Sequence, residues 1–205
     1  MHSEPPPDDA APPARAIVVT ALAFEGGLGL LAWILSWAFH IPLLAGIRWS
    51  AGDIALAIAA TIPLVVGLAL MTRYPMGPLR RLVEFVEQVI APLFVRCSTW
   101  ELAAIAMAAG VGEEMLFRGL VQQAVSDHYG PGVGLAVASL LFGLVHPITR
   151  TYAVLAALIG CYLGLVWLAT GNLLVPILVH GLYDFFALAY LVQRARATDG
   201  TVSKH

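Results

Sequence analysis

The chain has 205 residues, of which 60% are hydrophobic and only 12% are charged. A soluble domain of this size carries roughly a quarter of its residues as charged side chains. This composition therefore excludes a soluble globular domain. The formal net charge of -2 argues against a nucleic-acid partner, which requires a basic surface.

Apolar runs predict where the chain crosses a membrane. A spanning helix needs about 20 apolar residues to cross about 30 Å of hydrocarbon. Runs of about this length or more occupy residues 16–39, 52–72, 98–126, 131–149, 151–169 and 172–192. We therefore expect an all-α, polytopic transmembrane helix bundle of about six spans in contact with membrane lipid.

The same runs leave only short tails outside the membrane. We expect a single transmembrane domain over residues 15–193, with tails at 1–14 and 194–205. The first tail is rich in Pro and Asp, which is typical of disorder. It has no basic region before the first apolar run, so this run is expected to be an anchor rather than a cleaved signal peptide.

The distribution of basic residues predicts the orientation in the cell membrane. With six spans, Arg48 is the only Lys or Arg on one side. The other side holds Arg15, Arg73, Arg80, Arg81, Arg96, Arg150, Arg194, Arg196 and Lys204. Because basic loops stay in the cytoplasm, both termini are expected to be cytoplasmic.

The segment 78–95 differs from the six runs. Its apolar residues recur at helical spacing, opposite Arg80, Glu84 and Glu87. This pattern predicts an amphipathic helix, either lying in the cytoplasmic interface or packed as a connector under the bundle.

Ionisable residues also occur inside the expected spans. Placing a charged side chain in the bilayer costs free energy, so such residues usually mark a functional site. The third span carries Glu113-Glu114-Met115-Leu116-Phe117-Arg118. The fourth carries Phe142-Gly143-Leu144-Val145-His146, and the sixth carries His180-Gly181-Leu182-Tyr183-Asp184.

Helical geometry separates the roles of the two adjacent glutamates. Glu114 and Arg118 are four residues apart, so they share a helix face and can form an ion pair. Glu113 lies about 100° around the helix from Glu114 and has no local counter-charge. A buried carboxylate without a cation suits a general base. Gly110 and Gly112 should let neighbouring helices or water approach this turn.

The register of the helical hairpin offers an independent check. Glu113 and His146 are equidistant from the expected turn at Tyr129-Gly130, so they should lie level, roughly 20 Å below it. His180 and Asp184 again share a face. Counted from Asn172, however, His180 should lie only about 12 Å deep. A common site therefore requires a tilted last helix or a recessed turn.

These residues support two kinds of chemistry. Glu113 and His146 could hold an attacking water while His180 and Asp184 face the oxyanion. Alternatively, Glu113, His146 and His180 could bind a metal such as Zn²⁺. The sequence contains no HExxH motif, and Cys97 and Cys161 lack ligand spacing, so they are expected to be free thiols.

The three groups resemble the CPBP (Abi, or CAAX-protease and bacteriocin-processing) family of intramembrane proteases. The family pattern EExxxR, FxxxH and HxxxN or HxxxD is matched in order. The resemblance implies a membrane-embedded or lipidated protein or peptide as substrate. It also implies that Glu113 and His146 activate water and that His180 and Asp184 stabilise the oxyanion. Glu114, Arg118 and Phe142 would support the site.

Two other classes of function fit part of the pattern. Glu113, His146 and His180 could form a proton or cation relay in a transporter, although the sequence shows no symmetric halves. The fold could also serve a non-catalytic peptide-binding or immunity protein. Glu25 is an acid inside the first span with no motif around it, and the sequence assigns it no role. Substrate identity and oligomeric state are likewise open.

Overall fold

The structure, a computed structural model, describes residues 13–202. Every regular element within that range is a helix, which confirms the all-α fold class. The elements in chain order are α1 Ala14–Ala38, α2 Ala51–Arg73, α3 Gly77–Phe85, η1 Val86–Ile90, α4 Ala91–Phe94, α5 Thr99–Glu114, η2 Met115–Gln122, α6 Gln123–Tyr129, α7 Pro131–Leu144, α8 Arg150–Thr170 and α9 Leu174–Val202.

The lengths of these helices agree with a multi-pass membrane protein but do not reproduce six spans. Helices α1, α2, α8 and residues 174–197 of α9 are each long and apolar enough to cross a membrane. A fifth span results if residues 77–94 and 99–129, bent by 114°, count as one. The expected span 131–149 is shorter, because α7 has 14 residues and covers only about 21 Å.

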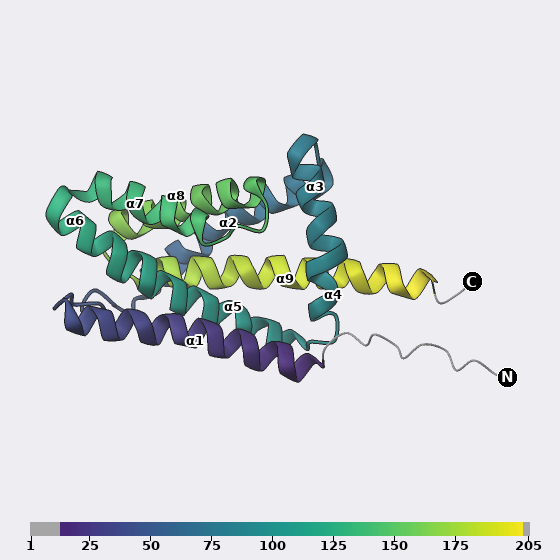
Figure 1. The fold of residues 1–205 in the computed structure, drawn as a ribbon, viewed down its shortest axis with the longest axis horizontal. Coiled ribbons are helices and arrows are strands. Elements are labelled where there is room, and N and C mark those ends of the chain that lie inside the picture. Colours follow the sequence, from purple (N-terminus) through teal and green to yellow (C-terminus); the bar gives the residue numbers. More distant parts are fainter. Residues whose placement is uncertain (1–12, 203–205) are drawn as a thin grey trace.

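The helices form a bundle in which α5 lies between α1 and α9 (Figure 1). On its other side α9 packs against α2 and α8, and α7 pairs with α8. Apolar residues of α2, α8 and α9 form one core cluster, which consists of Ala57, Leu163, Val175 and Val179. Large apolar side chains such as Trp37, 81% exposed, cover the outside, as expected for a surface that faces lipid.

The expected amphipathic segment is helical throughout. Elements α3, η1 and α4 form an arm that stands across one end of the bundle (Figure 1). Helix α1 begins and α9 ends at this same end. Most of the expected tail 1–14 lies outside the described residues, and Ala14 already belongs to α1. The expected tail 194–205 is helical as far as Val202.

The turn before α9 is buried inside the bundle. Asn172, which is 0% exposed, accepts hydrogen bonds from the backbone N–H groups of Arg48 and Leu174. Its amide nitrogen donates to the carbonyl of Arg48 and to the carboxylate of Asp53. The residues that follow, Leu173 to Val175, are also buried. The turn before α9 is therefore fixed to the segment that holds Arg48 and Asp53.

Candidate active site

The site is built on one long helix that changes its pitch. Glu113 and Glu114 end α5, and the chain continues without a break into the π-helical segment η2, which carries Arg118. Such π-helical segments occur frequently at functional sites. Glu114 is 0% exposed and Arg118 is 1% exposed, so both charges are removed from lipid and water alike.

Glu114 joins the α5–η2 helix to α9 through one oxygen atom. Its Oε1 lies 3.1 Å from NH1 of Arg118, so the ion pair expected from the spacing is present. The same Oε1 lies 2.8 Å from Nδ1 of His180 on α9, a contact that the sequence did not predict. Arg118 also donates through NH2 to the carbonyl of Gly160 on α8, at 2.8 Å. Together these contacts fix the relative positions of η2, α8 and α9.

Glu113 has a different environment. The residue is 8% exposed, and its Oε2 has no hydrogen-bond partner among the described residues. This oxygen lies 3.9 Å from Nε2 of His146, so the two residues meet at one level as the hairpin register predicts. The separation is too long for a direct hydrogen bond. Two atoms this far apart can share one bridging water about 2.8 Å from each, once a small movement of the side chains opens the closed surface of Oε2 to it.

His146 follows the end of α7 rather than lying within it. Helix α7 ends at Leu144, and the backbone N–H of His146 donates to the carbonyl of Gly143 in a turn. The prediction that the Phe142–His146 motif lies on a membrane helix is therefore wrong for His146, its last residue. Nδ1 of His146 lies 2.6 Å from the carbonyl oxygen of Phe142. When Nδ1 carries the proton for that bond, Nε2 is the nitrogen that faces Glu113.

His180 is held between two carboxylates. Nδ1 faces Glu114, and Nε2 lies 3.4 Å from Oδ2 of Asp184, four residues further along α9. The His180 side chain is 6% exposed, whereas that of Asp184 is 31% exposed. Asp184 therefore lies at the accessible edge of the site and His180 at its inner wall.

Aromatic rings separate the two parts of the site. The guanidinium carbon of Arg118 lies 4.7 Å from the centroid of the Phe142 ring, which is also 4.7 Å from the His146 ring. Tyr152 of α8 adds a ring 5.8 Å from that of His146. Sequence reasoning missed Tyr152, because it belongs to no motif and its only signal is its place just after the turn at His146.

Glycines allow the helices of the site to approach closely. A Cβ atom at Gly110 would lie 2.8 Å from the carbonyl oxygen of Ile177 and 2.9 Å from the backbone N of Gly181, both on α9. A Cβ at Gly112 would overlap the backbone carbonyl of Glu25 on α1. The expected close approach at these two glycines is therefore present, and α5 touches one helix through each of them.

The His and carboxylate side chains of the site are not arranged to coordinate a metal ion. Within residues 13–202, no group of three His, Cys, Asp or Glu side chains is placed to hold a metal ion. Catalytic zinc sites use three protein ligands. Glu113 and His146 offer two, but both ring nitrogens of His180 already face carboxylates. Cys97 and Cys161 are free, as expected.

A comparison with protein families bears on this site. The family model described as Type II CAAX prenyl endopeptidase Rce1-like matches residues 96–186, which include all three motif groups. This part of the chain is therefore similar to the CAAX-protease family that the three motif groups resemble. We call residues 96–186 the Rce1-like segment, which extends from α5 to the first half of α9. At the level of the family, the match indicates a CAAX-type intramembrane protease. No curated protein and no solved structure matches the chain.

Proposed function

We propose that the protein is an intramembrane endopeptidase that cleaves a membrane-embedded or lipidated substrate with a water activated between Glu113 and His146. The observation that carries this proposal is the buried, unpartnered Oε2 of Glu113, 3.9 Å from Nε2 of His146. A buried base and a second acceptor this close can hold one water in a fixed orientation. The Rce1-like segment supports the same class of reaction.

The proposed reaction uses these residues as follows. Oε2 of Glu113 removes a proton as the water oxygen attacks the carbonyl carbon of the scissile amide, and His146 holds the water. The carbonyl oxygen becomes an oxyanion, and a doubly protonated His180 donates to it the Nε2–H that faces Asp184 in the free protein. Glu113 then returns the proton to the departing amine as the C–N bond breaks. The products are a free amine and a carboxylic acid, which then releases its proton to solvent and becomes a carboxylate.

The remaining residues position this machinery in the proposal. Glu114 accepts a hydrogen bond from Nδ1 of His180, and Arg118 balances the negative charge of the Glu114 carboxylate. Asp184 orients His180 from the other side of the ring. This assignment accommodates an Asp at a position where relatives that process prenylated proteins carry Asn, because an ionised Asp cannot donate to an oxyanion.

A cleavage assay tests the proposal. The purified protein in lipid nanodiscs is offered apolar peptides with and without a prenylated cysteine, and the products are identified by mass spectrometry. We expect Glu113→Gln and His146→Ala to remove cleavage, whereas Glu84→Gln, an exposed change on α3, leaves it intact. Cleavage that survives Glu113→Gln would overturn the mechanism, and cation flux into liposomes without proteolysis would favour a relay. A chelator series tests metal dependence.

We also propose that both termini face the cytoplasm. The support is that α1 begins and α9 ends at the same end of the bundle (Figure 1), next to α3, which carries Arg80 and Arg81. Reporter fusions at each terminus test this. We expect both termini to report the cytoplasm, and two different sides would contradict the proposal.

A further inference from the structure

Glu25 is an ionisable residue that the proposed mechanism does not use. It is the only acidic residue in α1, a helix long and apolar enough to cross the membrane. It also lies outside the Rce1-like segment. An acid within a spanning helix is costly in lipid and is usually paired or functional. Glu25 therefore calls for a partner.

The position of Glu25 joins it to the proposed active site. A Cβ atom at Gly112, the residue before Glu113, would overlap the backbone carbonyl of Glu25, so α1 packs tightly on α5 beside the proposed base. Its carboxylate interacts electrostatically with His180, Asp184 and Glu113. Nevertheless, Oε2 of Glu25 is buried and accepts no hydrogen bond from any described residue.

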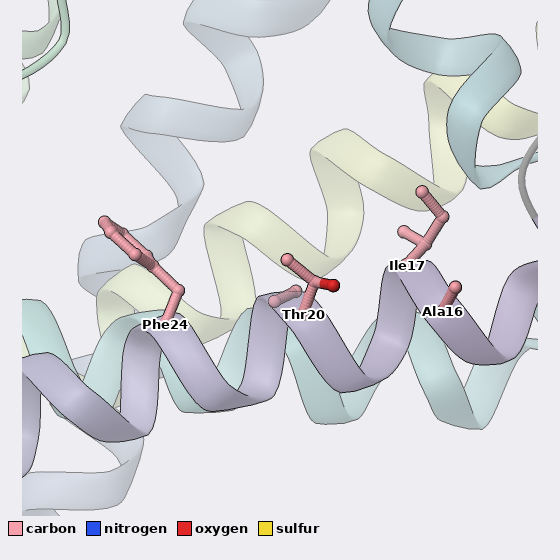
Figure 2. A pocket seen from close by; sticks show the side chains of 5 residues that line it. Ala16, Ile17, Thr20 and Phe24 are labelled. Carbon is pink, nitrogen blue, oxygen red and sulfur yellow. The ribbon is translucent and has the colours of Figure 1, made fainter.

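An apolar groove along α1 extends as far as Phe24, the residue before Glu25. The groove has a volume of about 430 Å³ and is lined by Ala16, Ile17, Thr20, Ala21 and Phe24. Figure 2 shows Ile17, Thr20 and Phe24 pointing from the same side of α1 into this space. Phe24, 63% exposed, precedes Glu25 directly, and Ala21 lies one helical turn before it. A chain lying in the groove would therefore reach Glu25 as it approaches the site.

The charges of the site favour a cationic group at this point. Four acids are near enough to interact electrostatically here, because Glu113 is influenced by Glu25, Glu114 and Asp184, and Glu25 by Asp184. Arg118 is the only Lys or Arg that pairs with any of them within residues 13–202, and it is already bound to Glu114 and Gly160. The excess of negative charge is therefore not balanced by a permanent cation of the protein itself.

We propose that Glu25 is a specificity-determining residue, whose carboxylate receives a Lys or Arg side chain from a substrate with an apolar segment in the α1 groove. The inference rests on the proposed protease function and names the class of its substrate. An unpaired cation and an unpaired carboxylate are each costly within the bilayer, and pairing them reduces both costs. Substrates with a basic residue near the scissile bond are thus preferred over neutral ones.

A peptide series tests this inference in nanodiscs. The peptides share one apolar sequence and carry Lys, Gln or Glu at a single position, which is scanned toward the scissile bond. We expect the wild-type kcat/KM for the best Lys peptide to exceed that of its Gln counterpart by about tenfold or more. Glu25→Gln should abolish this preference, and Glu25→Lys should shift it to the Glu peptide. Glu84→Gln is the matched control and should leave the preference unchanged.

The outcomes separate this inference from the proposed function. Glu113-dependent cleavage without a basic preference, or with a preference that survives Glu25→Gln, overturns the inference and leaves the protease intact. Absence of Glu113-dependent cleavage overturns the protease. In that case the binding of fluorescent peptides to Glu113→Gln, with and without Glu25→Gln, decides the role of Glu25. Equal Kd values for Lys and Gln peptides would overturn it, whereas a Glu25-dependent difference would support it.

Discussion

Glu113 and Glu114 are adjacent in the sequence, yet they occupy two different regions of the site. Oε1 of Glu114 contacts both Arg118 and His180, which ties together η2 and α9 in a dry interior. Oε2 of Glu113 contacts no hydrogen-bond donor of the described chain and faces His146 across 3.9 Å. One residue of helical rotation, about 100°, is enough to separate them.

The difference teaches how a charged site can exist inside a membrane bundle. A buried charge is tolerated when its partner is close and both are hydrogen-bonded. The Glu114 region meets this condition through Oε1 of Glu114 and NH2 of Arg118, while Oε2 of Glu114 and Nε of Arg118 have no hydrogen-bond partner among the described residues. The close ion pair lets this region serve as a support. The Glu113 region does not meet it, so its carboxylate remains available for a proton. We expect changes in the first region to affect mainly stability and changes in the second to affect mainly activity.

Glu114→Ala should have the largest effect on stability. It leaves Arg118 buried without a counter-charge, which costs about 3–5 kcal/mol of unfolding free energy. Equilibrium unfolding in mixed detergent micelles measures this loss. Glu113→Ala is the matched control and should remain close to the wild type. The double variant Glu114→Ala/Arg118→Met should regain part of the loss, because no unpaired charge remains. Equal destabilisation by both single alanine variants would contradict the comparison.

Glu113→Asp should sharpen the comparison from the other side. The shorter side chain withdraws the carboxylate by more than 1 Å from the water position beside His146. A displacement of this size costs about hundredfold in rate. We expect kcat/KM to fall by about that factor, while the unfolding free energy stays close to that of the wild type. A loss of stability in place of activity would assign Glu113 to the supporting region.

The sequence predicted the relations within a helix and across one hairpin better than those between helices that are far apart in the chain. The spacing of four residues placed Glu114 beside Arg118, and equal distances from the turn placed Glu113 level with His146. Both arguments use only the rise and rotation of a helix. The contact of Glu114 with His180 depends on how α9 is rotated and recessed against α5. Periodicity contains no information on that rotation.

The other differences have local causes. The run 131–149 is apolar throughout, yet α7 stops at Leu144 and a turn follows. Hydropathy cannot distinguish a helix from an apolar turn that is buried in protein. The sequence identified Glu25 as an acid inside a span but could not locate its neighbours, because the contact with Gly112 joins residues far apart in the chain.

Phe142→Leu should affect both regions moderately. The Phe142 ring lies against Arg118 and packs edge-on against Phe117 at 5.0 Å, while its backbone carbonyl faces His146. Losing the aromatic face should cost about 1–2 kcal/mol of unfolding free energy. Thermal unfolding and peptide cleavage measured together test this. Phe39→Leu, an exposed change beyond α1, is the control and should change neither. Unchanged unfolding of Phe142→Leu would show that the ring does not link the two regions.

Asp184→Asn should have the smallest effect on activity. The Asp184 side chain is 31% exposed and lies 3.4 Å from Nε2 of His180, whose other nitrogen remains bound to Glu114. An Asn side chain keeps an oxygen that accepts from Nε2 and is the residue that the resemblance associates with this position. We therefore expect kcat/KM to stay within about tenfold of the wild type, a change of about 1.4 kcal/mol or less. A loss greater than about a thousandfold in kcat, with KM unchanged, would instead mean that the Asp184 carboxylate itself takes part in the proton transfer. Glu113 and Asp184 would then have to share the role of proton acceptor.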